Sequence, residues 1–405
     1  MEKHHRREFL KKSLAGVSAA AFLPGYVSTS FAGLVSESGE QESIAYRTLG
    51  KTGLKLPVIS LGTSNIKTPG LVLEAMNSGI KLFTTSSYYG EGNNEIMLSE
   101  VIKNRPRDSF LIGTGSMPQG IDHQNGIFTD TNAAAKYRSD IEGGLKRLGL
   151  DYVDIIFLSF TAKRESIFFE PFLRMMEDFK KQGKCRFLAT TTHSFCDEAI
   201  RAAVDTKIYD MTVTAYNFRT EKVKDLDDSI AFAVKSGHGI LCMKSQAGGF
   251  WDKERKDPIN SQAAIKWVLQ NENITTVLSG MSTEQQLKQN IGLMSDLKFT
   301  DKEKNDLRLT SSEKVPGLYC QQCKKCIPQC PKNWDIPTAM RSFMYAYGYR
   351  DLTHAKETFG YTNIPADPCG SCERCSVNCT MGFDIRSRIQ DIARVNNVPD
   401  DFISA

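Results

Sequence analysis

Short runs of apolar and β-branched residues recur eight times between residues 44 and 312, and they limit the possible folds more than any other feature. Stretches with helical spacing separate them; within 131–148, for example, apolar residues recur every three or four positions. Eight strands that alternate with eight helices over this length predict an α/β protein, a (β/α)8 barrel. The runs are Leu56–Leu61, Ile80–Thr84, Phe110–Thr114, Val153–Leu158, Cys185–Thr190, Met211–Ala215, Ile240–Lys244 and Ile274–Leu278.

A doubly wound open sheet is the competing fold. It would need a glycine-rich phosphate-binding turn after the first strand, and residues 61–65 (LGTSN) do not supply one. In a barrel, the reactive groups lie at the carboxyl ends of the strands. Candidate site residues are therefore sought at those ends.

Composition excludes several classes of protein. Charged residues at 24% and a net charge of +4 are ordinary for a globular chain and too weak for a nucleic-acid-binding surface. No apolar run reaches the roughly 18 residues that a membrane-spanning helix needs. We expect a small-molecule substrate, with neither nucleic acid nor a membrane span.

An ordered set of motifs resembles the aldo/keto reductase family. The matching segments are 46–62, 79–90, 151–154, 183–187, 191–193, 216–217, 243–249 and 280–290, and together they cover roughly residues 45–295. The resemblance implies the barrel fold and, in ordinary members, reduction of a carbonyl by NADPH. It also implies where the catalytic groups should lie.

Members of that family use an Asp, a Tyr, a Lys and a His. The Tyr hydroxyl gives a proton to the carbonyl oxygen, the Asp-held Lys lowers the Tyr pKa, and the His orients the substrate. Carried over by motif, only Tyr89 remains, while Thr84, Gly115 and Ser159 stand at the Asp, Lys and His positions. The resemblance therefore predicts a degenerate tetrad.

A tyrosine without its lysine keeps a pKa near 10, which makes it a poor acid or base at neutral pH. Tyr89 is either retained for packing or has a function; the sequence leaves both open. His193 could replace the lost base, although its Thr-Thr-His stretch is itself a family pattern. His123 lies in a polar loop and is as compatible with plain surface as with function.

The resemblance leaves nicotinamide binding open. It implies nucleotide contacts at Thr191, Thr192, Lys244, Gln289 and Asn290. Many members also hold the 2′-phosphate with cations, but the corresponding positions here are Gly280 and Gln286, and Val213 replaces a common glutamine. We expect NADPH to bind weakly or not at all.

Eight of the eleven cysteines follow residue 319, in two runs of the same spacing. Cys320-x2-Cys323-x2-Cys326-x3-Cys330 is repeated at Cys369, Cys372, Cys375 and Cys379. The spacing is that of bacterial ferredoxins, in which the fourth cysteine of each run ligates the other cluster. It predicts two [4Fe-4S] clusters: one on Cys320, Cys323, Cys326 and Cys379, and one on Cys369, Cys372, Cys375 and Cys330.

Zinc and disulfides are the alternatives for these cysteines. Three cysteines at two-residue spacing plus a distant fourth, used twice, do not fit a pair of tetrahedral zinc sites. The segment between the runs has helical character at 336–349, so residues 313–405 are expected to form a mainly α-helical ferredoxin-like domain. Cys185, Cys196 and Cys242 are expected to be buried apolar residues.

The N-terminus has the parts of an export signal. A basic segment, an apolar segment and a small-residue site follow in order over residues 1–32, and Arg6-Arg7 with the following Phe-Leu-Lys resembles a twin-arginine signal. Residues 33–43 are expected to be a linker and 44–312 the barrel. We expect periplasmic or other export by the twin-arginine pathway, which carries folded proteins.

Three functions remain open. The first is an exported oxidoreductase whose clusters pass electrons to or from a redox partner protein. The second is an NAD(P)H-dependent carbonyl reductase with an accessory ferredoxin domain. The third is a non-enzymatic electron-transfer or binding subunit. The lost tetrad groups and the export signal favour the first.

Overall fold

The computed structural model describes residues 43–311 and 315–403. The expected signal peptide and almost all of the linker lie outside the described residues, as does the expected domain boundary at 312.

Eight parallel strands form a closed barrel, which confirms the predicted fold class. Around the barrel the order is β10-β11-β12-β3-β4-β5-β8-β9, so strands that follow one another in sequence lie side by side. Seven predicted runs match strands to within a few residues. The strands are β3 (Ile59–Gly62), β4 (Leu82–Thr84), β5 (Leu111–Gly115), β8 (Val153–Thr161), β9 (Cys185–Thr192), β10 (Met211–Ala215), β11 (Gly239–Met243) and β12 (Thr276–Gly280).

The first predicted run differs most from the structure. Its beginning, at Leu56, belongs to β2 (Lys55–Pro57), which pairs antiparallel with β1 (Tyr46–Thr48), and the barrel strand starts only at Ile59. Leu49 and Leu56 of this hairpin are fully buried and pack with Leu241 at the amino-terminal end of the barrel. The hairpin therefore closes the end opposite to the strands' carboxyl ends.

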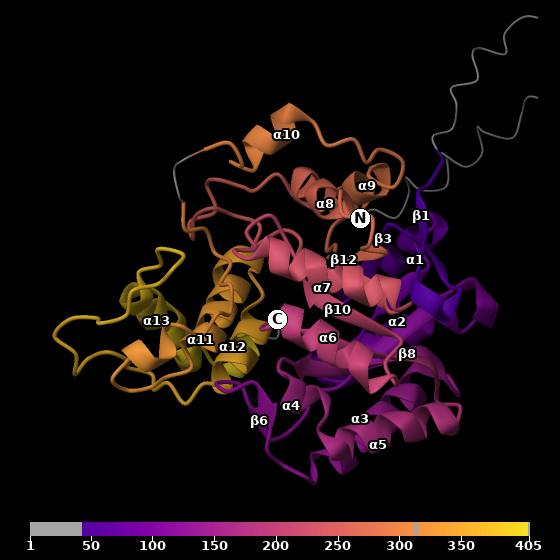
Figure 1. The fold of residues 1–405 in the computed structure, drawn as a ribbon, viewed down its shortest axis with the longest axis horizontal. Helices are drawn as coiled ribbons and strands as arrows, with labels where there is room; N and C mark the ends of the chain where they lie inside the picture. The colour runs from indigo at the N-terminus through magenta and orange to yellow at the C-terminus, as the bar shows by residue number, and fades with distance from the viewer. Residues whose placement is uncertain (1–42, 312–314, 404–405) are drawn as a thin grey trace, which may run out of the picture. The chain divides into compact units, whose positions relative to one another are not determined.

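Helices cover the barrel (Figure 1). They bury one apolar face against the strands, as α3 shows with Tyr137, Ile141 and Leu145. The helices of this part are α1 (Pro69–Asn77), α2 (Asn93–Ile102), α3 (Ala133–Leu148), α4 (Arg164–Ile167), α5 (Glu170–Lys181), α6 (Cys196–Thr206), α7 (Val223–Lys235), α8 (Ser261–Leu269), α9 (Glu284–Gly292) and α10 (Asp301–Asp306). Short 3₁₀ turns lie at Gly50–Thr52, Tyr89–Gly92 (η3) and Arg107–Ser109, and a small hairpin is formed by β6 (Ile121–Asp122) and β7 (Ile127–Phe128).

The chain after residue 315 is helical between its cysteine loops (Figure 1). The predicted helix over 336–349 is present, but its second half is a π-helix. The elements are η5 (Ile327–Gln329), α11 (Ile336–Phe343), the π-helix η6 (Met344–Tyr349), α12 (Leu352–Gly360), α13 (Ile385–Ala393), η7 (Arg394–Asn397) and α14 (Asp400–Ile403). No helix in the described part of the chain is long and apolar enough to cross a membrane.

The helical tail shares a hydrophobic core with one loop of the barrel. Phe343, Met344 and Phe359 of the tail belong to the same buried cluster as Ala247 and Trp251, which follow β11. The approach is closest at Gly348, where an added Cβ would overlap the carbonyl oxygen of Gly248. The tail therefore packs against the carboxyl-end side of the barrel, where the candidate site residues lie.

Candidate functional site

The four positions of the expected tetrad lie at one end of three neighbouring strands. Thr84 ends β4, Gly115 ends β5 and Ser159 lies near the end of β8, and these strands pair in that order. Tyr89 follows β4 in the turn η3. The structure thus places the three strand-end positions side by side, whereas the ring of Tyr89 lies against Tyr88 and His354.

The surroundings of Tyr89 make it a weaker acid. The pKa of Tyr89 is raised to about 12, mainly by burial and further by Tyr345 and Asp351 of the tail, while a hydrogen bond with Tyr88 opposes the shift. The ring of Tyr88 packs edge-on at 4.7 Å between centroids. A phenol with this pKa holds its proton firmly at neutral pH.

Position 115 has little space for a side chain. A Cβ added to Gly115 would lie 3.1 Å from both the Phe157 carbonyl oxygen and the Ser159 hydroxyl oxygen. The Gly115 carbonyl oxygen already accepts a hydrogen bond of 2.8 Å from the Ser86 hydroxyl. No group at this position can hold a proton or lower the Tyr89 pKa.

The expected nucleotide contacts are largely used within the protein. The Thr191 hydroxyl oxygen accepts a 3.3 Å hydrogen bond from the backbone N–H of Phe160, and the Thr192 hydroxyl donates to the Ser194 carbonyl at 2.9 Å. The Asn290 amide donates to the Ser279 hydroxyl at 3.0 Å.

Gln289 and Lys244 complete the set, and they lie in different surroundings. Gln289 is exposed on α9. The ammonium of Lys244 donates to the Tyr345 hydroxyl at 2.9 Å and lies 4.5 Å from the centroid of the same ring. The helical tail therefore engages Lys244, which sequence patterns could not show.

A narrow inner pocket lies where the tail meets the barrel. Its barrel wall contains His193, which follows β9, and Lys244, which follows β11. The remaining lining residues come from the tail: Tyr319, Cys320, Gln322, Arg341 and Met344. A wider, open pocket at the rim is lined by residues that include Tyr88, His123 and Tyr361.

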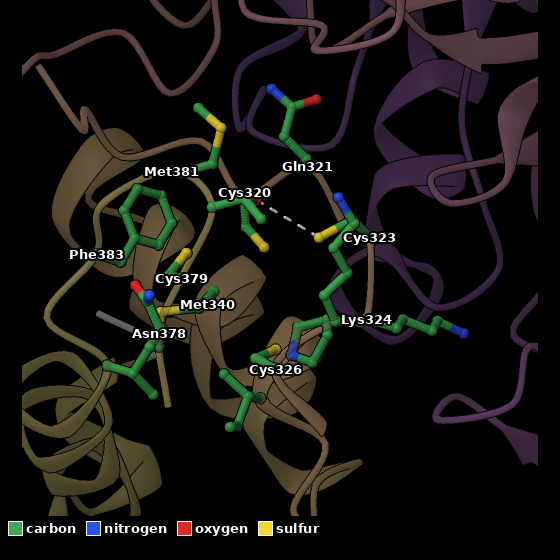
Figure 2. Close-up of a pocket in the computed structure, with 15 residues that line it drawn as sticks. Cys320, Gln321, Cys323, Lys324, Cys326, Met340, Asn378, Cys379, Met381 and Phe383 are labelled. Carbon is green, nitrogen blue, oxygen red and sulfur yellow. Dashed lines mark hydrogen bonds between the residues drawn. The ribbon is translucent and has the colours of Figure 1, made fainter. Parts of the chain in front are cut away.

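Four cysteines surround a third pocket, which lies within the tail (Figure 2). The sulfur atoms of Cys320, Cys323, Cys326 and Cys379 point toward a common space, although Cys379 belongs to the second run. Burial raises the pKa of the Cys320 thiol, and the thiols of Cys326, Cys323 and Cys379 add to the shift. Without a ligand, burial and the neighbouring sulfurs disfavour the thiolate form of these cysteines. Four thiolates at this place therefore require a cationic centre among them.

The other four cysteines also mix the two runs. Burial raises the pKa of Cys369, with further contributions from Cys372, Cys375 and Cys330. The backbone N–H of Cys372 donates to the Cys369 carbonyl at 3.1 Å. Each group therefore holds three cysteines of one run and the last cysteine of the other.

The donor set fits an iron–sulfur cluster better than a single ion. In residues 43–311 and 315–403, no group of three or more His, Cys, Asp or Glu side chains is arranged to hold one metal ion. Four thiols spaced around a cavity are the donors of a four-iron cluster, whose irons lie apart from one another. One guanidinium nitrogen of Arg388 is buried and has no hydrogen-bond partner. The sulfurs of Cys320 and Cys379 interact electrostatically with this guanidinium and favour its charged form.

Comparison with known proteins agrees with both halves of this arrangement. Residues 63–261 match the model of the aldo/keto reductase family. The chain contains an aldo/keto reductase domain. Residues 319–384, which include all eight clustered cysteines, match a 4Fe-4S dicluster domain, so the tail is a domain of the kind that binds iron–sulfur clusters.

Individual relatives of the aldo/keto reductase domain are distant. L-galactose dehydrogenase of Arabidopsis thaliana is 24% identical over 298 residues, which cover 63% of this chain and 89% of the plant protein. The holo form of aldo-keto reductase AKR11C1 from Bacillus halodurans superposes with a TM-score of 0.52 at 17% identity, over 66% of this chain and 96% of that one. The thermostable aldo-keto reductase Tm1743, in complex with the inhibitor epalrestat, superposes with a TM-score of 0.52 at 19% identity, over 66% of this chain and 99% of that one. At these identities the structures support the fold alone.

Several groups near the aldo/keto reductase site were not expected from sequence. Phe160, with a φ of +60° at the end of β8, stacks on His193 at 5.5 Å and meets His123 edge-on at 5.7 Å. His354 of α12 lies 4.1 Å from the Tyr345 ring. Of these, His123 and His193 had a signal in the sequence, whereas Phe160 and His354 had none.

Burial keeps the three histidines near the aldo/keto reductase site neutral at physiological pH. It lowers the pKa of His123 and of His354 to about 3 each, with help from nearby cations. The pKa of His193 also falls well below its ordinary value, because burial, Lys244 and Arg341 disfavour its charged form. His123 is half-buried and stacked on Tyr361, so the plain-surface interpretation does not describe it.

Proposed function

We propose that this protein is an exported iron–sulfur oxidoreductase in which the barrel mouth binds a small molecule and two [4Fe-4S] clusters connect it with a redox partner protein. One observation carries the proposal: Cys320 lines both the four-cysteine pocket and the inner pocket that contains His193 and Lys244. A ligand in the inner pocket would lie against a cysteine of the first cluster site.

The tetrad positions support electron transfer over ordinary carbonyl reduction. We infer that the tetrad is degenerate, because Thr84, Gly115 and Ser159 cannot replace an Asp, a Lys and a His. Tyr89 is left with a pKa of about 12, whereas acid–base catalysis is most efficient near the operating pH. A chain that lacks this proton relay is poorly suited to carbonyl reduction by hydride transfer, because the carbonyl oxygen has no efficient proton donor. Single-electron chemistry at the cysteine groups is then the better-supported activity.

The cysteine groups supply the sites for that source. The first cluster would be held by Cys320, Cys323, Cys326 and Cys379, and the second by Cys369, Cys372, Cys375 and Cys330. When bound, such clusters exchange single electrons at potentials that charge and hydrogen bonds around the sulfurs adjust. Arg388 places a buried cation beside Cys320 and Cys379, where it would offset the negative charge of a thiolate-ligated centre.

A nicotinamide-dependent dehydrogenase is the second candidate. The match to a plant protein named L-galactose dehydrogenase favours it, as does the presence of Tyr89. Against it stand the use of Lys244 by Tyr345 and the narrowness of the inner pocket. The twin-arginine signal also counts against it, because the nicotinamide pool is cytoplasmic.

One anaerobic titration separates these functions. Purified protein is mixed with NADH, with NADPH and with dithionite, and the absorbance of the clusters is followed. We expect bleaching by dithionite alone. Rapid bleaching by NADPH would favour the dehydrogenase, and clusters that are reduced but transfer no electrons to any small molecule would favour the non-enzymatic subunit. Cys196→Ser, outside both runs, is the control that should keep its iron, whereas Cys323→Ser should lose part of it.

A further inference from the structure

Arg341 is a buried cation without a counter-ion. It lies on α11 with 7% of its surface exposed, and its guanidinium is 5.3 Å from the centroid of the Phe160 ring. Its Nη2 atom is buried and has no hydrogen-bond partner. Among the residues that the structure describes, no carboxylate forms an ion pair with it. Burial of an unpaired charge is costly, so such a group indicates a missing anion.

Two further donors line the same pocket. Lys244 donates one hydrogen bond, to the Tyr345 hydroxyl, which leaves the other N–H groups of its ammonium available. His193 has a buried Nδ1 atom without a partner. Asp351 acts on Lys244 through its charge, but its carboxylate lies 4.0 Å from His354 and forms no ion pair with Lys244 among the described residues. The inner pocket thus collects two cations and an unpartnered imidazole nitrogen.

The first cluster site could supply the anion, but the geometry of α11 argues against it. Ile336, Pro337 and Met340 line the four-cysteine pocket, whereas Arg341 and Met344 line the inner pocket. Successive helical residues point about 100° apart, so Arg341 is turned from the cysteines toward the barrel. At the cysteine pocket Arg388 already provides the buried cation.

We propose that the inner pocket binds the charged end of a small organic carboxylate, whose oxygens accept hydrogen bonds from Arg341, Lys244 and His193. This inference deepens the proposed function and rests on it, because it names the substrate class for the oxidoreductase. The fork of a guanidinium matches the two oxygens of a carboxylate. The pocket has room for little more than a water-sized group, which suits a carboxylate and excludes a nucleotide.

Binding is tested by anaerobic calorimetry on the cluster-loaded protein. The probes are acetate and pyruvate, with methyl pyruvate as the uncharged match. We expect the two anions to bind and the ester to bind far more weakly. Arg341→Gln should weaken pyruvate binding by about 10- to 100-fold, and Arg341→Lys by less, since one charge remains without the fork. The matched control is Arg394→Gln, a 77%-exposed arginine of the same domain, which should leave binding unchanged.

Stability of the ligand-free variants gives an independent readout. Removal of an unpaired buried charge should raise the melting temperature, so ligand-free Arg341→Gln should be at least as stable as the parent. If Arg341 were instead the partner of the cluster, the variant would lose stability and its reduction potential would fall. That result, or equal binding of pyruvate and its methyl ester, or no binding of either anion, overturns the proposal. Iron content and dithionite reduction of the same samples test the proposed function separately.

Discussion

Tyr89 keeps a hydroxyl at the barrel mouth but is surrounded by groups that hold its proton in place. Burial, Tyr345 and the carboxylate of Asp351 together raise the pKa of Tyr89 to about 12, although a hydrogen bond with Tyr88 acts in the opposite direction. At the lysine position, Gly115 offers no cation to reverse this shift. At the scale of single residues, Tyr89 is therefore poorly suited to donate the proton that carbonyl reduction in this fold family requires.

The first prediction concerns that tyrosine. Tyr89→Phe should change NADPH-dependent reduction of simple aldehydes and ketones very little, because the parent protein should show only a negligible rate. Loss of a working acid would cost about 10²–10⁴-fold. Steady-state assays of both proteins, loaded with clusters, make the comparison. A parent that reduces carbonyls at an ordinary rate and loses it in the variant would contradict the proposed function.

The second prediction concerns pH and Glu357. Burial, together with Asp351 and Glu91, raises the pKa of Glu357 from 4.5 to about 7. The folded protein holds the Glu357 proton more tightly than the unfolded chain does. This carboxyl therefore contributes stability that is fully present below about pH 4.5 and is lost as the pH rises through about 7. Glu357→Gln should therefore raise the free energy of unfolding at pH 8 by an amount on the order of 1 kcal/mol, and with it the melting temperature, and should have little effect at pH 4.5.

Melting curves of the two proteins across this pH range make the measurement. Glu284→Gln, an exposed glutamate of α9, is the matched control and should shift the curves at neither pH. An equal effect of Glu357→Gln at both pH values would refute the assignment.

Sequence patterns located the groups that follow barrel strands but missed those that depend on the tail. Thr84, Gly115 and Ser159 lie where the ordered motifs placed them, because strand order fixes which strand ends are neighbours. Arg341 and His354 come from a helical segment whose docking on the barrel has no signature in periodicity. A charged residue within the apolar stretch 336–349 was the one available sign.

At the scale of elements, the contact between η6 and the loop after β11 holds the tail on the barrel. Gly348 meets the Gly248 carbonyl there, and Tyr345 of the same π-helix engages Lys244. π-helical turns often occur at functional sites. The sequence predicted a helix here but not its π-helical half, because the preference for that geometry arises from the packing and not from the local residues.

The third prediction tests this contact. Gly348→Ala should destabilise the protein by about 1–3 kcal/mol, because its methyl group would overlap the Gly248 backbone and force the tail outward. Thermal unfolding and iron content measure the effect. Gly360→Ala, at the end of α12 with open space around its Cα, should cost far less. Equal stability of the two variants would show that η6 is not tightly docked.

At the scale of the whole molecule, each group of four cysteines combines three cysteines of one run with the last cysteine of the other run. The fourth prediction follows from this grouping. Anaerobically purified protein should be brown, with about eight iron atoms, as two four-iron clusters require. Cys379→Ser, although it lies in the second run, should damage the same cluster as Cys323→Ser, and Cys330→Ser the same cluster as Cys372→Ser. Electron paramagnetic resonance distinguishes the two sites; stoichiometric zinc without acid-labile sulfide would refute the assignment.

The fifth prediction concerns export. Conversion of both Arg6 and Arg7 to lysine should leave the precursor in the cytoplasm, because the twin-arginine pathway reads the arginine pair itself. Cell fractionation measures how much of the protein remains in the cytoplasm. Conversion of Lys3 and Lys12 to arginine keeps the arginine pair, the Phe-Leu-Lys that follows it and the charge, and should leave export intact. Unchanged export of the double-lysine variant would mean that the signal has another nature.

The two walls of the inner pocket come from segments at least 75 residues apart in the sequence. His193 and Lys244 form one wall, and Cys320 and Arg341 belong to the other. Neither wall alone encloses a ligand, so the pocket exists only while the tail is packed on the barrel. Displacement of the tail would therefore remove the ligand site and the cluster sites from the barrel mouth together.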